Sequence, residues 1–222
     1  MSIKLYPYQK RLIRSKAKFI LDEKSRQIGI SFALGYIAIR DALTKKMTTI
    51  FQSMDGPKGI NFIDDCKIIL KELNPERVDG KPNPAYIEYE ALTKEIRFEN
   101  GGKIFAISSN PNASRAYNGN VFIDEAAFHD DFATTLTAAL SCTDRGDGRC
   151  IVVSTHNGPA TDFYALCEEV RQGKPYWEHH YTDLPLAIKD NYHRQIVRDS
   201  GNHPMKQNLD DDNFDELFYQ YM

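Results

Sequence analysis

The stretch KSRQIGISFALGYIAI, residues 24–39, directly follows the extended run AKFILDE. This order predicts a strand, a tight loop and a helix, which is how phosphate-binding loops are built. The usual loop, G-x-x-x-x-G-K-[ST], carries a lysine directly before its final Ser or Thr. Gly29 and Ser31 fall in register with that pattern, but Ile30 replaces the lysine and Lys24 replaces the first glycine. Either the stretch is a chance strand–turn–helix, or the cation has moved to the front of the loop.

The physics of anion binding tolerates a displaced lysine. Backbone N–H groups of a tight turn and the positive end of the following helix supply most of an anion cradle. An ammonium at Lys24 can still neutralise phosphates, and the Ser31 hydroxyl can ligate a magnesium ion. Arg26 is a second candidate cation, although a loop arginine can equally face solvent. The candidate phosphate cradle consists of Lys24, Ser25, Arg26, Gln27, Ile28, Gly29, Ile30 and Ser31.

The composition is typical of a globular chain without a strong overall charge. Of the 222 residues, 41% are hydrophobic and 27% are charged, and the net charge is −3. A nucleic-acid partner would therefore have to be contacted by a local basic patch. The longest apolar run, FALGYIAI, is too short to span a bilayer and no signal peptide opens the chain, so we expect no membrane association. The four cysteines show no C-x-x-C pairing and are expected to be free thiols in a reducing cytosol.

Outside the opening stretch, short apolar segments alternate with helical patterns. Strand-like runs lie at MTTIFQS, VFIDEAAF, CIVVSTH and YWEHHYTDL, and apolar residues at helical spacing occupy segments between them. The run over residues 84–109 alternates apolar and polar residues and predicts an antiparallel meander. We therefore expect an α/β fold, with a mostly parallel sheet flanked by helices and a β-hairpin insertion.

The last segment, LDDDNFDELFYQYM, predicts a capped amphipathic helix. It carries aromatic side chains, Phe214, Phe218 and Tyr219, that we expect to be exposed. We accordingly divide the chain into one domain over residues 1–205 and the start of a linker helix over residues 206–222.

Asp124 and Glu125 end the apolar strand NVFIDE. A phosphoryl-transfer ATPase needs a carboxylate at a strand tip near its magnesium ion and a neighbouring carboxylate to orient the attacking water. Alone, the pair is more typical of a strand that ends in two solvated acids. Together with the candidate loop, the pair favours a nucleotide site in which Glu125 orients the water and Asp124 and Ser31 ligate magnesium.

Three segments together resemble the motors that package phage DNA. These segments are similar to the modified Walker A, Walker B and coupling motifs of large terminase subunits, and in that order they are KSRQIGIS, VFIDEAAF and IVVSTHNG. Within the family, the resemblance is strongest to the Mu-like phage group. Some members of that family carry the Walker A lysine at the front of the loop, as here. The resemblance runs from about residue 5 to the last residue. It implies a P-loop ATPase domain of the RecA/ASCE-like type.

The resemblance extends to the segment upstream of the loop. LYPYQ is similar to the adenine-reading segment of these proteins, in which an aromatic side chain, here Tyr6 or Tyr8, packs on the base. Gln9 would pair with the N6/N7 edge of adenine, because an amide suits that edge. Without the resemblance, Gln9 is equally well explained as an exposed residue at a helix start.

The resemblance also assigns roles to Arg115, Ser154 and Thr155. Arg115 lies just before the Walker B segment, where terminases hold an arginine that completes the site of a neighbouring subunit. A loop arginine is otherwise usually solvated. Ser154 and Thr155 match the coupling motif, which links hydrolysis to movement, and their hydroxyls would contact the γ-phosphate side or the lytic water.

Several other polar residues are interpreted as structural. His179 and His180 are sequential on a predicted strand, so they point to opposite faces and cannot share a metal ion. His129 and Asp130 are expected to cap the following helix. Five cations near the start of the chain are expected to be solvated rather than to contact DNA. They are Lys10, Arg11, Arg14, Lys16 and Lys18.

The resemblance implies a function and a set of partners. The function is ATP hydrolysis with Mg²⁺ that drives double-stranded DNA into a procapsid, and the partners are the portal protein and the small terminase subunit. We expect a homo-oligomeric ring in the assembled motor and a monomer in isolation. The expected location is the cytoplasm of the infected or prophage-carrying bacterial cell, outside the mature virion.

Full-length large terminases also carry a metal-dependent nuclease built on clustered acids. The acidic run Asp210 to Asp212 lies in a predicted loop with no sheet to converge it, so we expect no nuclease activity in this chain. Two alternative functions stay open. One is a helicase-type ATPase, because DEAA is close to the helicase pattern. The other is a degenerate nucleotide-binding docking module without turnover, which Ile30 favours.

Overall fold

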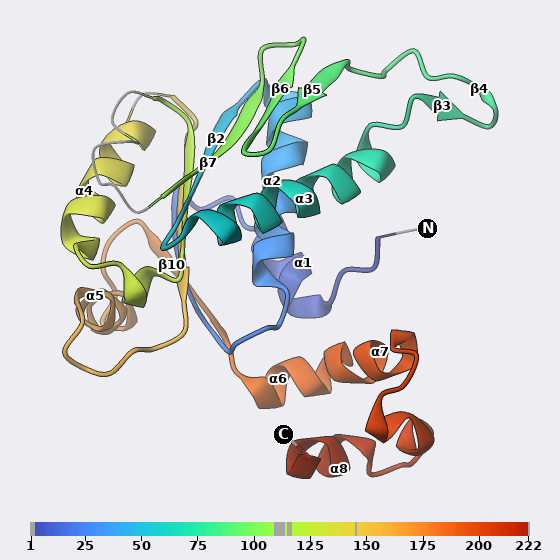
Figure 1. Cartoon of the computed structure of the whole chain (residues 1–222). Coiled ribbons are helices and arrows are strands. Elements are labelled where there is room, and N and C mark those ends of the chain that lie inside the picture. The colour runs from blue at the N-terminus through green and yellow to red at the C-terminus, as the bar shows by residue number, and fades with distance from the viewer. Residues whose placement is uncertain (1–2, 109–113, 115–116, 145, 222) are drawn as a thin grey trace.

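Eight strands form the central sheet in the order β10-β1-β9-β8-β2-β7-β6-β5 (Figure 1). The computed structural model describes residues 3–108, 114, 117–144 and 146–221. Neighbouring strands from β10 to β7 are parallel, whereas β6 and β5 are antiparallel additions at one edge. The expected α/β fold with a mostly parallel sheet is confirmed. The strands are β1 (Phe19–Lys24), β2 (Thr48–Ser53), β5 (Tyr89–Ala91), β6 (Glu95–Phe98), β7 (Lys103–Ser108), β8 (Asn120–Asp124), β9 (Cys150–Ser154) and β10 (Trp177–Thr182).

Helices cover both faces of this sheet. In Figure 1, α1, α2 and α3 lie on one side of it, and α4 and α5 lie on the other. Successive side chains of a strand point to opposite faces, so Phe122 of β8 packs in the cluster with α1–α3. Its neighbours Val121 and Ile123 pack in the cluster with α4 and α5. The helices are α1 (Pro7–Arg14), α2 (Ile30–Lys45), α3 (Gly56–Leu73), α4 (Phe132–Thr143) and α5 (Asp162–Arg171), with a 3₁₀ turn η1 (Ala126–Phe128).

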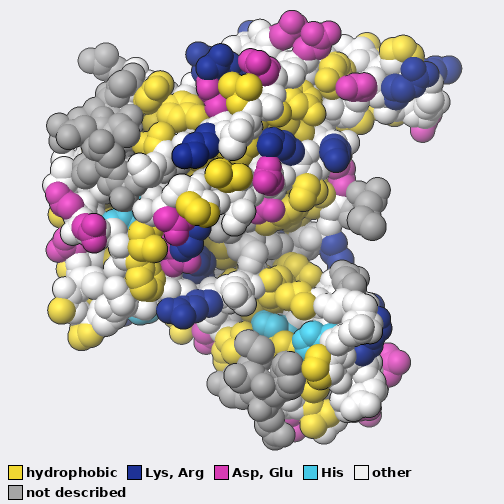
Figure 2. All heavy atoms as spheres, in the orientation of Figure 1, with side chains coloured by type: hydrophobic (Ala, Val, Ile, Leu, Met, Phe, Trp, Pro, Cys, Tyr) yellow, Lys and Arg dark blue, Asp and Glu magenta, His cyan; other side chains and the backbone are white. Residues whose placement is uncertain are grey.

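A β-hairpin lengthens the sheet beyond β7. β5 and β6 pair antiparallel, with Tyr89 opposite Phe98, and β6 pairs with β7. The expected hairpin insertion is therefore present. The last strand of the expected meander, β7, also pairs parallel with β2 and therefore belongs to the central sheet. Its apolar side chains are accordingly buried on both faces of that sheet. A second short hairpin, β3 (Arg77–Val78) with β4 (Lys81–Pro82), ends an arm at the upper right of Figure 1, and Figure 2 shows Lys and Arg side chains there.

The C-terminal helices are built around an apolar cluster of their own. Phe214 and Phe218, which the sequence led us to expect as exposed, are 0% and 2% exposed because they pack with Ile188 and Val197. The side chain of Tyr219 lies outside the described residues. The cluster reaches back across residue 205, and the domain division expected there stays a prediction. The segments are α6 (Leu184–Lys189), α7 (Tyr192–Asp199), the 3₁₀ helix η2 (Pro204–Asn208) and α8 (Phe214–Tyr221).

Two further expectations concern the chain as a whole. None of the helices in the described ranges combines the length and apolarity that crossing a membrane requires. The four cysteines are free thiols, as expected, and all four are buried.

Candidate nucleotide-binding site

The segment between β1 and α2 forms a tight loop at the carboxyl edge of the sheet. Gln27 and Gly29 both adopt left-handed backbone conformations, with φ of 55° and 72°. A Cβ at Gly29 would lie 2.9 Å from Gln9 Nε2, so glycine suits both the conformation and the space. The helix α2 begins at Ile30, and the first turn of a helix has N–H groups without partners inside the helix. This backbone geometry is compatible with the predicted anion cradle, and anion binding by the loop stays a prediction.

Hydrogen bonds from α1 hold the carbonyl groups of this loop. The Tyr8 hydroxyl donates to the carbonyl oxygen of Ile28 at 2.6 Å, and Gln9 Nε2 donates to that of Gly29 at 2.8 Å. These donors occupy carbonyl oxygens that would otherwise repel an anion. The loop is thus fixed in shape by residues outside it.

The C-terminal helices are fastened to the same loop. The hydroxyl of Tyr192, at the start of α7, donates to the carbonyl oxygen of Gln27. The Tyr192 ring meets that of Tyr6 edge-on, with 5.0 Å between the ring centroids. In the preceding turn, Asp190 Oδ2 accepts from the backbone N–H of Tyr8 at 3.2 Å. The C-terminal helices therefore contact both the loop between β1 and α2 and the helix α1 that supports this loop.

These contacts bear on the residues expected to read adenine. Tyr8 is 2% exposed and packs in the core, so its ring supports the loop and is not presented to a base. The Gln9 amide is 3% exposed, and its Oε1 accepts from Tyr6 N at 2.9 Å while its Nε2 holds the loop. Tyr6 is half-buried and stacks on Tyr8, with ring centroids 5.9 Å apart. Of the two aromatic candidates, the structure favours Tyr6.

The acidic pair lies beside the loop, at the end of β8. Ser31 Oγ donates to Asp124 Oδ2 at 2.9 Å, and the backbone N–H of Glu125 donates to Asp124 Oδ1 at 3.0 Å. Burial raises the pKa of Asp124, and the nearby charge of Lys24 only partly offsets this. A buried carboxylate beside a hydroxyl provides the hard oxygen ligands that Mg²⁺ prefers, and a bound cation would lower that pKa. The residues present therefore fit a magnesium ion.

Lys24 reaches from the front of the loop to the acidic pair. Its Nζ lies 3.2 Å from Glu125 Oε1, and its side chain is 6% exposed. Arg26, the other candidate cation, is exposed. A cation that we did not single out from the sequence, Lys58, lies 3.8 Å from the same Glu125 oxygen. The sequence feature that could have identified Lys58 is the run DGPKG, in which Asp55 caps α3 directly after β2. The strand β2 pairs with β8, which carries the acidic pair at its end.

These groups border one cavity of about 280 Å³. The helix α3 contributes Asn61 and Asp65 to its wall. Burial, together with neighbouring Asp64, raises the pKa of Asp65 to about 6. Since a water molecule takes about 30 Å³ of liquid volume, the cavity has room for phosphate groups. It is lined by Lys24, Gln27, Ile28, Gly29, Ile30, Ser31, Phe51, Lys58, Asn61, Phe62, Asp65, Asp124 and Glu125.

Ser154 and Thr155 lie at the end of β9, the strand between β1 and β8. Ser154 Oγ accepts from the backbone N–H of Ala127 at 3.0 Å and donates to the carbonyl oxygen of Thr155 at 2.7 Å. Thr155 Oγ1 is buried and has no hydrogen-bond partner among the described residues. The structure thus joins Ser154 to the turn that follows Glu125. Contact of either hydroxyl with the γ-phosphate or the lytic water stays a prediction.

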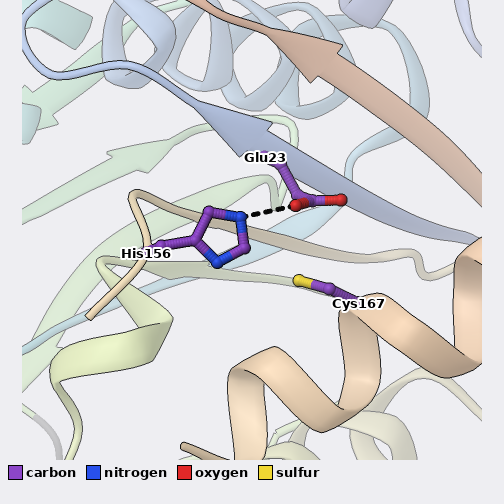
Figure 3. Close-up of side chains that lie close together, drawn as sticks. All are labelled: Glu23, His156 and Cys167. Atoms are coloured by element: carbon purple, nitrogen blue, oxygen red, sulfur yellow. Dashed lines mark hydrogen bonds and ion pairs between the residues drawn. The ribbon is translucent and has the colours of Figure 1, made fainter. Parts of the chain in front are cut away.

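The buried carboxylate of Glu23, in the strand that leads into the loop, is the centre of an ion-pair network, and Figure 3 shows its contact with His156. His156 Nε2 and His179 Nε2 each lie 2.6 Å from its carboxylate, and Arg171 donates to both carboxylate oxygens. Burial raises the pKa of Glu23, but the hydrogen bonds from Arg171, His156 and His179 outweigh it, so the pKa is lowered overall. Figure 3 places Cys167 beside this pair, with its sulfur within 4.8 Å of the Glu23 and His156 ligand atoms. Because Arg171 already engages both oxygens, we interpret the cluster as an ion-pair network rather than a metal site.

The structure corrects one expected helix cap. The helix α4 is capped by Asp131, whose carboxylate accepts from the backbone N–H of Thr134 at 3.0 Å. Neither His129 nor Asp130 caps it, because the capping side chain stands directly before the first helical residue. His129 Nε2 instead lies 3.0 Å from the carbonyl oxygen of Asp124, and burial lowers the pKa of this histidine.

Two other expectations can be placed. His179 contacts Glu23 whereas His180 contacts Glu178, so the two histidines do not share a site, as expected. Arg115 lies outside the described residues, and its role in the site of a neighbouring subunit stays a prediction.

Comparison with known proteins supports the expected resemblance. A family model described as "Terminase large subunit, T4likevirus-type, N-terminal" matches residues 23–218. The Mu-like prophage FluMu protein gp28 of Haemophilus influenzae is 32% identical over 201 residues, which cover 87% of this chain and 39% of that protein. The probable terminase large subunit gp28 of Escherichia phage Mu is 29% identical over 198 residues, which cover 85% of this chain and 36% of that protein. The chain therefore spans less than two fifths of the length of these two relatives.

A solved structure shares the fold. The large terminase ATPase domain of Thermus phage P74-26 matches with a TM-score of 0.67 at 16% identity, covering 91% of this chain and 90% of that one. At this identity the likeness concerns the fold alone, and the family follows from the match over residues 23–218. The chain belongs to the family of phage terminase large subunits and corresponds to their N-terminal part.

Proposed function

We propose that this chain binds ATP with Mg²⁺ and hydrolyses it to drive double-stranded viral DNA into a procapsid. The observation that carries the proposal is a pair of contacts across the cavity, Lys24 to Glu125 and Ser31 to Asp124. These contacts bring a cation, a water-orienting acid and two oxygen ligands for a metal ion to one phosphate-binding loop. The family match over residues 23–218 to the N-terminal part of terminase large subunits supports this function.

Lys24 exchanges partners when the nucleotide binds. In the structure its ammonium pairs with Glu125, and Lys58 stands near the same oxygen. A triphosphate at the loop draws Lys24 to itself, because its oxygens carry more charge than one carboxylate. Glu125 then keeps Lys58 and has an oxygen ready to accept a hydrogen bond from the attacking water. Lys24 in this way neutralises the phosphate and releases the base.

Ser31 and Asp124 would hold the magnesium ion. A magnesium ion held by these two residues would neutralise negative charge on the phosphate groups. The raised pKa of Asp124 supports this assignment, because the carboxylate lacks enough positive charge around it to offset its burial. The Ser31 hydroxyl, which donates to Asp124 in the structure, would turn its lone pairs to the ion.

The rest of the assembly is proposed from the family. Arg115 of a neighbouring copy would complete the site in a homo-oligomeric ring, with the chain a monomer in isolation. The ring would act with the portal protein and the small subunit in the cytoplasm of the infected bacterium, outside the mature virion. Residues 1–205 would form the ATPase domain, and residues 206–222 would begin a linker helix.

Turnover is favoured over a docking role without hydrolysis. The docking alternative rested on Ile30, which is 2% exposed and packs in the core. A cation at that position is not needed, because Lys24 already stands at the acidic pair.

Nucleotide binding and magnesium-dependent phosphate release by purified protein test the proposal. Glu125→Gln should keep the ATP affinity while turnover falls roughly 10²-fold or more, the usual scale for losing a positioned base. Asp124→Asn should lose the part of binding that depends on magnesium. Glu99→Gln, the same change at an exposed site on the hairpin, is the matched control. Unchanged turnover in Glu125→Gln would assign the base elsewhere, and a wild-type chain that binds no ATP would refute the function.

A further inference from the structure

A second cavity of about 640 Å³ lies at the edge of the sheet opposite the nucleotide loop. Its walls come from the end of α1, the segments that lead into β1 and β9, and the last turns of α2. Because β1 and β9 are parallel, their starts meet at the amino edge of the sheet, whereas the nucleotide loop lies at the carboxyl edge. The charge of this cavity is one-sided. Its cationic lining residues are Arg14, Lys16, Lys18, Arg40, Lys45 and Arg149, against one acid, Asp147.

A single buried carboxylate anchors the inner cations. Asp41 is 1% exposed, and its Oδ1 accepts from Arg40 Nε at 3.0 Å and Nη2 at 2.9 Å. Lys45 Nζ and Arg149 Nη2 each lie 3.8 Å from this carboxylate. Glu178 also interacts electrostatically with Arg149. Two negative charges therefore face three positive ones, and the floor of the cavity keeps a net positive charge.

Arg149 is the most buried of these cations, at 6% exposed. Its Nη1 donates to the carbonyl oxygen of Ser15 at 2.8 Å, but its Nε and Nη2 have no hydrogen-bond partner among the described residues. A buried guanidinium with unpaired N–H groups is costly, and the cost falls when an anion lies nearby. The floor is therefore arranged to favour negative charge in the cavity.

The outer cations are exposed, and among the described residues Lys18 contacts only the face of the Phe19 ring, with 5.9 Å from its Nζ to the ring centroid. Arg14, Lys16 and Lys18 make no ion pair with any described residue. From the sequence we expected them to be solvated surface charges. They are exposed, as expected, and the structure also brings them together with three cations that are distant in sequence, on a chain whose net charge is −3. Such a local excess of charge attracts polyanions.

We propose that this cavity binds the sugar–phosphate backbone of DNA. The cations supply phosphate contacts. No aromatic side chain is among the described residues of the lining, which argues against base stacking, so binding is independent of sequence. The identity of the polyanion as double-stranded DNA rests on the proposed function. Two elements connect this site to the nucleotide loop, since β1 runs from beside Lys18 to Lys24 and α2 runs from Ile30 to Lys45.

Charge reversal at the outer cations tests the assignment. The probe is a short fluorescein-labelled DNA duplex of arbitrary sequence, and the readout is anisotropy over a series of salt concentrations. Lys16→Glu with Lys18→Glu should weaken binding at least tenfold. It should also reduce the slope of log K against log salt by about 2, since each phosphate contact contributes roughly 0.9. The control is Lys71→Glu with Lys189→Glu, which makes the same charge change at exposed lysines that do not line the cavity.

The possible outcomes separate this inference from the proposed function. A control pair that weakens binding as much as the cavity pair would overturn the site, because overall charge would then explain both. A wild-type chain that hydrolyses ATP but binds no duplex would also overturn the site and leave the ATPase intact. A wild-type chain without ATP turnover refutes the proposed function whatever the anisotropy shows. Unfolding midpoints establish that each variant is folded, and Lys16→Gln with Lys18→Gln, a milder change, should give the same slope change if charge reversal prevents folding.

Discussion

Replacing Lys24 by alanine tests whether the cation at the front of the loop does the work usually done by a lysine before the final serine. The ammonium is almost wholly buried and lies 3.2 Å from Glu125. A hydrogen bond from such a charged group contributes roughly 1.5–3 kcal/mol. We expect ATP affinity to fall by the corresponding factor, roughly ten- to a hundredfold. The fold should survive the change, because Glu125 keeps Lys58 as a partner.

Equilibrium binding of a fluorescent ATP analogue, with turnover measured on the same samples, gives the comparison. Ile30→Val is the control, since trimming one methylene from a core isoleucine costs roughly 0.5–1.5 kcal/mol of stability without touching the cation. Its ATP affinity should match the wild type. Ile30→Lys restores the usual pattern and should not rescue Lys24→Ala, because position 30 points into the core. Unchanged affinity in Lys24→Ala, or full rescue by Ile30→Lys, would refute the displaced-lysine reasoning.

Three further predictions follow from the loop, the network behind it and the assembled motor. Gly29→Ala should cost about 1–2 kcal/mol in chemical unfolding, because φ is +72° and the new Cβ meets a buried amide, and an unchanged midpoint would contradict this. Hydrogen bonds from Arg171, His156 and His179 lower the pKa of Glu23 in the folded chain, so its contribution to stability is present at neutral pH and is lost as the pH falls through the folded pKa. The stability difference between wild type and Glu23→Gln should accordingly shrink in acid, and a difference that stays constant would assign no ionised role to Glu23. Turnover should rise more than linearly with protein concentration, since an arginine supplied in trans contributes roughly 10³–10⁵ in rate. A mixture of the Arg115→Ala and Glu125→Gln proteins should likewise recover partial activity. Fast turnover by a demonstrated monomer would remove Arg115 from the site.

Local order along the chain was enough to predict the central contacts. A strand, a loop with Gly29 and Ser31, and a later strand ending in Asp124 define a parallel sheet whose carboxyl edge gathers all three. Ser31 and Asp124, which are 93 residues apart and in contact, were accordingly predicted to share one magnesium site. Lys24 and Glu125 were predicted for the same nucleotide site, but the contact between them was not predicted.

Contacts that depend on strand order could not be predicted in this way. Lys58 joins the site only because β2 lies next to β8, and the order of strands in a sheet cannot be predicted from any single segment of the sequence. Likewise, Arg171 contacts Glu23, 148 residues away, because α5 packs over β1. This packing depends on the whole core and not on either segment alone. Phe214 looked exposed because its cover comes from short helices without a long apolar pattern.

Tyr192 connects the C-terminal helices to the candidate phosphate-binding loop. Its hydroxyl is bonded to the carbonyl oxygen of Gln27, and its ring rests against Tyr6. If this bond differs in strength between the nucleotide-bound and nucleotide-free loop, the position of α7 and the affinity for nucleotide are thermodynamically linked. Such a linkage acts equally in both directions. A load that pulls α7 away would lower the affinity for nucleotide by the same factor by which nucleotide strengthens the attachment of α7. In the proposed motor, force applied to the C-terminal helices would then act as an effector.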